Sequence, residues 1–257
     1  FVLDGDITKK NLGLDNNNIN LLGKEINEIF HCAAETQLNL SLSDLRKIHV
    51  EGTTNVLDMV MLFNKNGKPK KVSHFSTAYV CGDSCRLFNE KDLDVSQKFN
   101  TPYEQSKFEA EKIIDVYRKN GVWIDIFRPP AVVGESTTGK TFQMKHIYEL
   151  FHIWGLDILD YFPNEDKFSI NLVCVDQVAE AVCFVSSKIN IRNNTYHLFG
   201  KKAFYTKDIF DLARKCIGFK RPLLLTLKEF NKKGASFVQK KIVEKTNLFN
   251  IVSEEKL

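Results

Sequence analysis

The sequence predicts an α/β protein built on a doubly wound, Rossmann-like parallel sheet, and three observations carry this prediction. Short apolar runs alternate with stretches of helical spacing, which is typical of parallel sheets with helices on both faces. The runs at 29–34, 71–77 and 122–130 end in small, hydroxyl or proline residues. A strong helix start follows the second run. Ligands bind beyond the carboxyl ends of such strands, so we expect a site at that edge.

The elements are expected in the following order. Apolar spacing predicts strands at 29–34, 71–77, 122–127, 170–173 and 196–199, and helices at 43–63, from 101 onward, 142–154, 176–186 and 206–216. Residues 1–6 read as a strand end turning into a loop. Because the chain opens on Phe1 and inside such a run, we expect a fragment whose sheet is truncated at its N-terminus.

Two parts are expected along the chain. Residues 1–135 form the truncated dinucleotide-binding part in this prediction. Residues 136–257 form a smaller, largely helical substrate-binding part, interleaved with the last strands and helices of the sheet. A chain of 257 residues is long enough for one large domain or two small ones.

Composition narrows the functional class. The hydrophobic fraction of 43% and the charged fraction of 26% are ordinary for a soluble protein. No apolar run is long enough for a membrane span, and the net charge of +4 is spread without a nucleic-acid-binding patch. No basic segment followed by an apolar one opens the sequence, so secretion is not expected. The six cysteines lack Cys-x-x-Cys spacing, so reduced cytoplasmic thiols are expected, with neither metal nor disulfides.

The segment 101–107, Thr-Pro-Tyr-Glu-Gln-Ser-Lys, carries the strongest local signal. Thr101 suits an N-cap, Pro102 the first helical position, and Glu104 can reach back to the cap. Tyr103 and Lys107 are four residues apart and therefore share one helix face. A nearby ammonium lowers the pKa of a phenol, which predicts an acid/base pair. The alternative is an exposed lysine beside a half-buried tyrosine.

Taken together, the motifs resemble those of the extended short-chain dehydrogenase/reductase family over about residues 1–200. Residues 76–82 resemble the strand that carries the catalytic Ser/Thr, Tyr103 and Lys107 match Tyr-x-x-x-Lys, and 128–134 resemble Arg-Pro-x-x-Val-x-Gly. Gly5-Asp6 and Cys32-Ala33-Ala34 are similar to cofactor-side segments. Residues 49–53 resemble Asn-Val-x-Gly-Thr, with His49 in place of Asn.

Within that family, the chain resembles the thioester reductase domains that end some polyketide and nonribosomal peptide synthases, and the related fatty acyl-CoA reductases. Residues 134–139, Gly-Glu-Ser-Thr-Thr-Gly, are similar to a Gly-Asp-Ser-x-Thr-Gly loop of that group. Residues 171–176 are similar to its Asn-x-Val-x-Val-Asp segment. The family's first strand and Gly-rich phosphate loop have no counterpart here, and they are the part that distinguishes NADP from NAD.

The resemblance implies hydride reduction of an acyl thioester to an aldehyde or alcohol. It implies NADPH, with NADH as the alternative, and an acyl carrier protein bearing a phosphopantetheine-bound chain, or acyl-CoA, as the partner. The implied catalytic residues are Thr77, Tyr103 and Lys107, with Ser76 as a substitute for Thr77. The implied cofactor contacts are Gly5, Asp6, Ile7, Cys32, Ala33, Ala34, Tyr103, Lys107, Pro129 and Val132. The implied substrate contacts are Ser76, Gly134, Ser136 and Thr138.

Other readings stay open at this point. Residues 134–141 also fit the phosphate-loop pattern G-x-x-x-x-G-K-[ST], with Asp176 as a candidate acidic partner. An epimerase or dehydratase acting on a nucleotide sugar would share the fold, and a non-catalytic remnant is a third hypothesis.

Several single residues also have two readings. We expect His31 and His74 to be packed residues. His49 is expected to be structural, with a catalytic role as the alternative. Arg128 is expected to pair with a carboxylate near the sheet end, and Glu35 to face either the site or solvent. The basic stretch 228–247 reads as a solvated amphipathic helix or as a dock for an acidic carrier.

Overall fold

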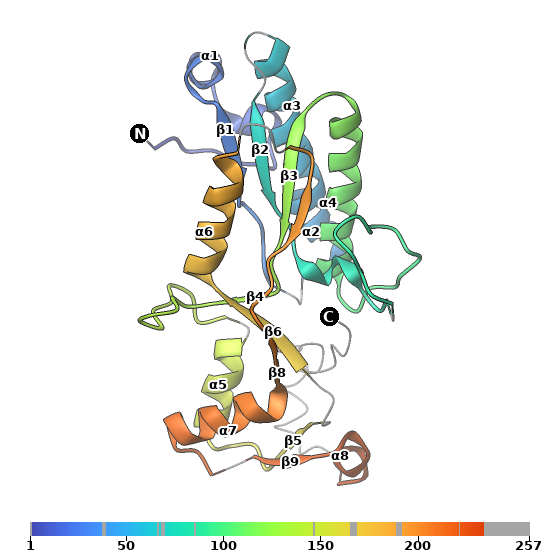
Figure 1. The fold of residues 1–257 in the computed structure, drawn as a ribbon, viewed down its shortest axis with the longest axis vertical. Coiled ribbons are helices and arrows are strands. Elements are labelled where there is room, and N and C mark those ends of the chain that lie inside the picture. The colour runs from blue at the N-terminus through green and yellow to red at the C-terminus, as the bar shows by residue number, and fades with distance from the viewer. Residues whose placement is uncertain are drawn as a thin grey trace. The chain divides into compact units, whose positions relative to one another are not determined.

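The computed structural model describes residues 2–37, 40–65, 67, 70–84, 86–145, 147–164, 169–188, 192–220 and 222–233 (Figure 1). The chain forms two compact units. The first comprises Phe1–Pro130 and Val178–Leu198, and the second comprises Ala131–Gln177 and the chain from Phe199 onward.

A four-stranded parallel sheet forms the centre of the first unit. Its strands are β1 (Glu28–His31), β2 (Lys71–Phe75), β3 (Trp123–Arg128) and β7 (Thr195–His197), in the order β1-β2-β3-β7. All three strand pairings are parallel, and the register sets His31 beside His74. The predicted α/β class with a parallel Rossmann-like sheet is therefore confirmed.

Helices cover this sheet and build its core. The helices of the first unit are η1 (Lys10–Gly13), α1 (Asn16–Glu25), α2 (Leu42–Arg46), η2 (Lys47–Glu51), α3 (Gly52–Lys65), η3 (Ala78–Cys81), α4 (Pro102–Lys119) and most of α6 (Val175–Ser186). Leu57 and Val60 of α3 and Ile114 of α4 pack with apolar residues of β2 and β3. In Figure 1, α6 lies in front of the sheet and α3 lies behind it.

The helix predicted at 43–63 is continuous but not uniform. Between α2 and α3, residues Lys47–Glu51 form a π-helical turn, and the chain stays helical on both sides of it. A π turn inserts extra backbone into a helix and is rare, occurring frequently at functional sites. Here the turn carries His49, whose side chain is buried.

The second unit contains two small sheets and three helices among its described residues. Strands β4 (Ala131–Val133), β6 (Ser169–Cys174) and β8 (Ala203–Tyr205) form one sheet, and β5 (Tyr161–Pro163) pairs with β9 (Leu223–Leu225). The helices are α5 (Ile147–Gly155), α7 (Thr206–Ile217) and α8 (Leu227–Lys233). Their core is aromatic and centres on Trp154, which contacts Phe162 and Phe210 edge to face.

Two predicted elements differ from the structure. Residues 2–6 form no strand, so Gly5 and Asp6 do not end one; instead the amide of Asp6 bonds to Leu12 and its carboxylate accepts from Thr8. The helix predicted at 142–154 begins only at Ile147, because the preceding loop is held by its own hydrogen bonds. Most of the predicted basic helix at 228–247 lies outside the described residues.

Candidate active site

Two neighbouring strand ends are tied together at the carboxyl edge of the first unit's sheet. β2 ends at Phe75, and Ser76 and Thr77 follow it. The amide of Ala78 donates to the carbonyl oxygen of Pro129, just after β3, at 2.9 Å. Thr77 also caps η3 by accepting from the amide of Tyr79. These bonds fix the position of the Thr77 hydroxyl.

The helix α4 begins as the sequence predicts. Thr101 is the N-cap and accepts from the amide of Glu104 at 3.2 Å, while Glu104 accepts from the Thr101 hydroxyl at 3.1 Å. Pro102 occupies the first turn, where its missing amide hydrogen costs nothing. This cap determines where the helix begins, so Tyr103 lies in its first turn and Lys107 lies one turn later on the same face.

Tyr103 and Thr77 come together in the structure. Burial raises the pKa of Tyr103 to about 12, and a hydrogen bond with the Thr77 side chain acts in the opposite direction with a smaller effect. The expectation that Lys107 lowers this pKa is therefore wrong for this arrangement. The physical reason is that burial penalises the phenolate more than its neighbours stabilise it. Tyr103 consequently keeps its proton at neutral pH.

Lys107 is buried, with only 3% of its surface exposed. Its ammonium donates to the carbonyl oxygen of Phe75 at 2.7 Å, which ties α4 to the end of β2. Burial lowers the pKa of Lys107 to about 8, and the negative charge of Glu111 acts in the opposite direction. The lysine thus carries its charge at neutral pH and loses it only slightly above.

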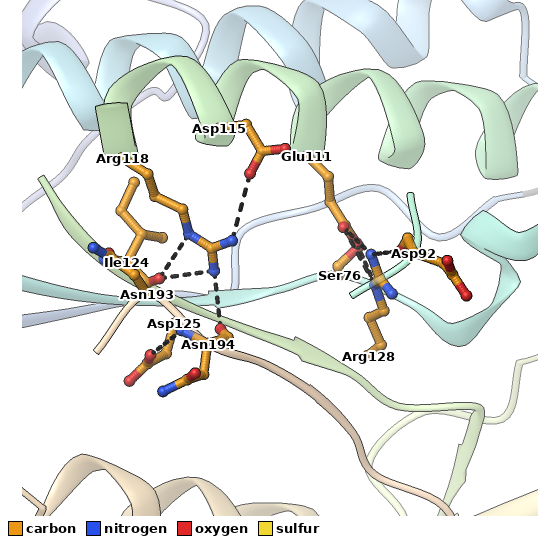
Figure 2. A network of polar contacts seen from close by, with 10 residues as sticks. All are labelled: Ser76, Asp92, Glu111, Asp115, Arg118, Ile124, Asp125, Arg128, Asn193 and Asn194. Carbon is orange, nitrogen blue, oxygen red and sulfur yellow. Dashed lines mark hydrogen bonds and ion pairs between the residues drawn. The ribbon is translucent and has the colours of Figure 1, made fainter. Parts of the chain in front are cut away.

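A buried ion pair joins α4 to the end of β3 at the carboxyl edge of the sheet (Figure 2). Arg128 donates to both carboxylate oxygens of Glu111, with a shortest distance of 2.6 Å, and the Ser76 hydroxyl donates to the same carboxylate. The prediction that Arg128 pairs with a carboxylate is confirmed. The Ser76 proton is engaged at 2.5 Å, whereas the Thr77 hydroxyl donates only at 3.5 Å, to the carbonyl oxygen of Pro129, so Thr77 is the better placed of the two to turn to a substrate.

A cavity of about 590 Å³ lies between α4, β3 and β7 on the same side as this network. Arg118 and Arg128 line it, and both guanidinium groups are already bonded. Arg118 donates to the carbonyl oxygens of Ile124 and Asn194 and pairs with Asp115 (Figure 2). These contacts brace α4 against the sheet edge.

Three buried histidines surround Lys107. Burial, followed by the positive charge of Lys107, lowers the pKa of His31 and of His49 to about 4. The same causes hold the pKa of His74 well below its ordinary value. All three imidazoles are therefore neutral at pH 7, and the expectation that His31 and His74 are packed residues is confirmed.

The predicted cofactor contacts divide into groups. Cys32, Ala33 and Ala34 follow β1 and are exposed, so small side chains leave this strand end open to a ligand. Ile7 packs against Gly52, where any Cβ would lie 2.8 Å from the Ile7 side chain. Gly5 and Asp6 precede it in an irregular segment. Pro129 follows β3 in the first unit, and Val132 belongs to β4 of the second unit.

The loop after β4 contains the predicted substrate contacts Gly134, Ser136 and Thr138. The Ser136 amide and hydroxyl both donate to the carboxylate of Asp176, with the amide at 3.0 Å. The Thr138 hydroxyl donates to Glu135. The two motifs that resemble the thioester reductase group are thus bonded to each other within the second unit.

The same loop does not have the form of a phosphate-binding loop. The amides of residues 134, 135, 136, 139 and 140 all donate within the protein, so they cannot cradle phosphates. The following helix begins at Ile147, well after Lys140 and Thr141. The phosphate-loop hypothesis is therefore contradicted.

Some residues of the site were not anticipated from the sequence. Glu111 lies four residues after Lys107, so the spacing Tyr103, Lys107, Glu111 was an available signal. Ser106 and Thr53 gave none, because their partners, His49 and His31, are distant along the chain. Glu35 is half-buried, and its carboxylate accepts from the amides of the next two residues.

Comparison with known proteins agrees with these features. A family model described as "Male sterility protein" matches residues 1–182. The chain belongs to the male sterility/thioester reductase family of NAD(P)-binding domains. The chain is also 31% identical over 193 residues to the non-canonical nonribosomal peptide synthetase cpsA of Aspergillus campestris. That match covers 71% of the chain and 18% of the synthetase, so the chain spans a small part of this relative.

Solved structures share the fold of this chain. The terminal R domain of the myxalamid PKS-NRPS pathway superposes with a TM-score of 0.78 at 22% identity, covering 97% of the chain and 61% of that structure. A thiolation-reductase di-domain from an archaeal nonribosomal peptide synthetase gives 0.74 at 18% identity, covering 98% and 54%. Within the described part of the chain, no helix has the length and apolarity needed to cross a membrane.

Proposed function

We propose that this protein reduces an acyl thioester with NADPH or NADH, as the terminal reductase domain of a polyketide synthase-like enzyme. The observation that carries the proposal is the meeting of Thr77 and Tyr103 at the sheet edge, with Lys107 one helical turn away. A hydroxyl hydrogen bond and a protonated phenol are what a carbonyl oxygen needs when it gains negative charge.

The chain's own residues have separate roles in this reaction. As hydride reaches the carbonyl carbon, Thr77 donates a hydrogen bond to the oxygen and Tyr103 transfers its proton to it. Because the pKa of Tyr103 is about 12, the phenol is protonated and ready to donate at neutral pH. The product is a thiohemiacetal, which collapses to an aldehyde and releases the thiol. A second hydride and proton would give the alcohol.

The residues present fit a nicotinamide cofactor. The cofactor supplies the hydride when it is bound. Lys107 would hold the ribose, since its ammonium is charged at neutral pH and already fixed to the end of β2. Cys32, Ala33 and Ala34 would lie against the cofactor, with Gly5, Asp6 and Ile7 toward the adenine and Pro129 and Val132 as further contacts.

The substrate is proposed to be an acyl chain on the phosphopantetheine arm of a carrier protein, or on CoA. The archaeal relative couples a thiolation domain to its reductase, which supports a carrier partner. The loop at 134–139 would contact the arm through Gly134, Ser136 and Thr138. The Ser136 and Thr138 protons are engaged, so these hydroxyls would accept from the amide N–H groups of pantetheine.

The test supplies the full-length protein with NADPH or NADH and either an acyl-pantetheine thioester or a nucleotide sugar. We expect loss of nicotinamide absorbance together with release of free thiol, only with the thioester. Turnover of the sugar without the thioester would replace this function by that of an epimerase or dehydratase. Cofactor binding without turnover of any thioester would favour the non-catalytic hypothesis.

A further inference from the structure

Two hydrogen bonds bracket the open end of β1. Before it, Nε2 of His31 lies 3.2 Å from the hydroxyl of Thr53. After it, Nε2 of His49 lies 2.9 Å from the carbonyl oxygen and 3.2 Å from the amide of Glu35. The bracketed residues are Cys32–Ala34, and both anchors come from one continuous helix, four residues apart. The helix therefore fixes both ends of the segment proposed to contact the cofactor.

His49 also reaches the proton donor from its other side. Its Nδ1 lies 2.8 Å from the hydroxyl of Ser106, and that hydroxyl is 2.9 Å from the backbone oxygen of Tyr103. The imidazole and the Tyr103 ring meet edge to face, with centroids 5.6 Å apart and planes at 83°. One side chain thus contacts both α4 at Tyr103 and the chain that leaves β1.

The local backbone is shaped for this role. His49 lies at the middle of the π-helical turn Lys47–Glu51, and only 2% of its surface is exposed. An uninterrupted α-helix would hold its side chains at a different rotation around the axis. His49 stands where the motif that it resembles has Asn, whose shorter side chain can place an amide atom where Nδ1 stands but does not extend to the place of Nε2.

We propose that His49 is a positioning residue that couples the cofactor-binding end of β1 to the proton donor Tyr103. The proposal rests on the proposed function, and it assigns two arms to one imidazole. The arm to Glu35, together with the Thr53–His31 bond, holds the cofactor segment in place. The arm to Ser106 and the ring contact hold the phenol where a carbonyl oxygen is reduced.

The experiment compares variants of the full-length protein that remove the Thr53–His31 bond, the Ser106 arm of His49, or both arms of His49. Thr53→Val removes the first bracket, Ser106→Ala removes the link to α4, and His49→Ala removes both arms. Thr54→Val is the matched control, because the Thr54 hydroxyl donates to the carbonyl oxygen of Val50, within the same continuous helix, at 2.9 Å. The measurements are the Kd of NADPH by fluorescence titration, kcat with the acyl thioester, and Tm.

The variants are expected to differ in whether they change mainly the Kd of NADPH or mainly kcat. Thr53→Val should raise the Kd of NADPH more than it lowers kcat, and Ser106→Ala should lower kcat more than it raises Kd. His49→Ala should change Kd and kcat by about tenfold each, as expected when each constant loses the support of one hydrogen bond. In the double variant His49→Ala/Ser106→Ala, kcat should fall no further than in His49→Ala. Changes that follow Tm alone, or His49→Ala with both constants unchanged, would overturn the proposal.

A variant that keeps the fold and a readout without turnover complete the design. If His49→Ala does not fold, His49→Asn places an amide where Nδ1 stands and is too short to reach Glu35, so kcat should recover and the Kd of NADPH should not. Recovery of both constants would count against the two-arm role. Amide exchange at Glu35–Gln37 should accelerate in His49→Ala or His49→Asn even without substrate. That result together with an inactive parent would refute the proposed function and leave the coupling intact, whereas unchanged exchange would refute the coupling.

Discussion

The ammonium of Lys107 donates a 2.7 Å hydrogen bond to the carbonyl oxygen of Phe75, the last residue of β2. This bond joins the helix that carries the proton donor to the strand that leads to Thr77. It also withdraws the lysine from water, and burial lowers the pKa of Lys107 to about 8. One contact therefore sets both the geometry of the site and its response to pH.

The alkaline limb of activity should reflect this lysine. In the free protein Lys107 loses its charge as pH rises through about 8, while Tyr103, with a pKa of about 12, stays protonated. We expect kcat/KM for the thioester to fall above about pH 8. In Lys107→Arg, whose guanidinium stays charged, any remaining activity should lack this limb. A profile that is flat to about pH 10 in the parent would contradict the assignment.

Replacing Tyr103 by Phe should remove the transferred proton and little else. The ring and its contact with His49 are kept, so the fold and the cofactor site should persist. We expect kcat to fall by at least about 100-fold, in the usual range for a lost general acid, with the Kd of NADPH changed less than about twofold. Parental turnover by Tyr103→Phe in the absorbance assay would exclude the phenol as the donor.

The Arg128–Glu111 pair should contribute strongly to stability because it is buried. Arg128→Met leaves the Glu111 carboxylate without its ion partner, which typically costs about 3–5 kcal/mol. The pair Arg46–Glu109 has the same 2.6 Å distance but is partly exposed, so Arg46→Met should cost much less stability than Arg128→Met. Denaturant unfolding of both variants tests this contrast. Equal losses would mean that burial does not decide the strength of these pairs.

The buried histidines should make the protein sensitive to acid. His31 has a folded pKa of about 4 and an unperturbed value of 6.5, so the unfolded chain binds its proton first as pH falls. The stability that His31 contributes is complete above pH 6.5 and is lost toward pH 4, by roughly 3 kcal/mol at about 1.4 kcal/mol per pKa unit.

A pair of variants tests this acid sensitivity. His31→Gln should reduce the slope of unfolding free energy against pH between 7 and 5. His152→Gln, which replaces an exposed histidine, should leave the slope as in the parent. An unchanged slope in His31→Gln would argue that the imidazole is not buried in the neutral form.

The loop at 134–139 should affect the substrate and not the cofactor. Asp176→Asn weakens the bonds that hold the Ser136 amide and hydroxyl, because a neutral oxygen is a poorer acceptor than a carboxylate. We expect a several-fold higher KM for the acyl thioester, with the Kd of NADPH unchanged. Asp208→Asn, in the first turn of α7, is the matched control. A higher Kd for NADPH with an unchanged KM would remove this loop from the substrate side.

The fold and the Tyr103/Lys107 pair could be predicted from the sequence because both depend on local regularities. The spacing of apolar residues predicts the alternation of strands and helices. Tyr103 and Lys107 share a face because they are one helical turn apart in a helix capped at Thr101. The motif order was also sufficient to indicate the thioester reductase family. These features can be predicted without knowing which distant segments of the chain are in contact.

The tertiary structure decided what depends on burial and on contacts between distant segments. It raised the pKa of Tyr103 where the spacing alone predicted a lowered one, because the penalty for burying a phenolate outweighs its neighbours. It brought Ser76 and Arg128 to Glu111, and Glu35 and Ser106 to His49. It also engaged the amides of residues 134–136, 139 and 140 in hydrogen bonds within the protein, although the pattern alone predicted that they could bind phosphate. Sequence spacing fixes which side chains share an element, whereas desolvation and hydrogen-bond satisfaction depend on how the elements pack.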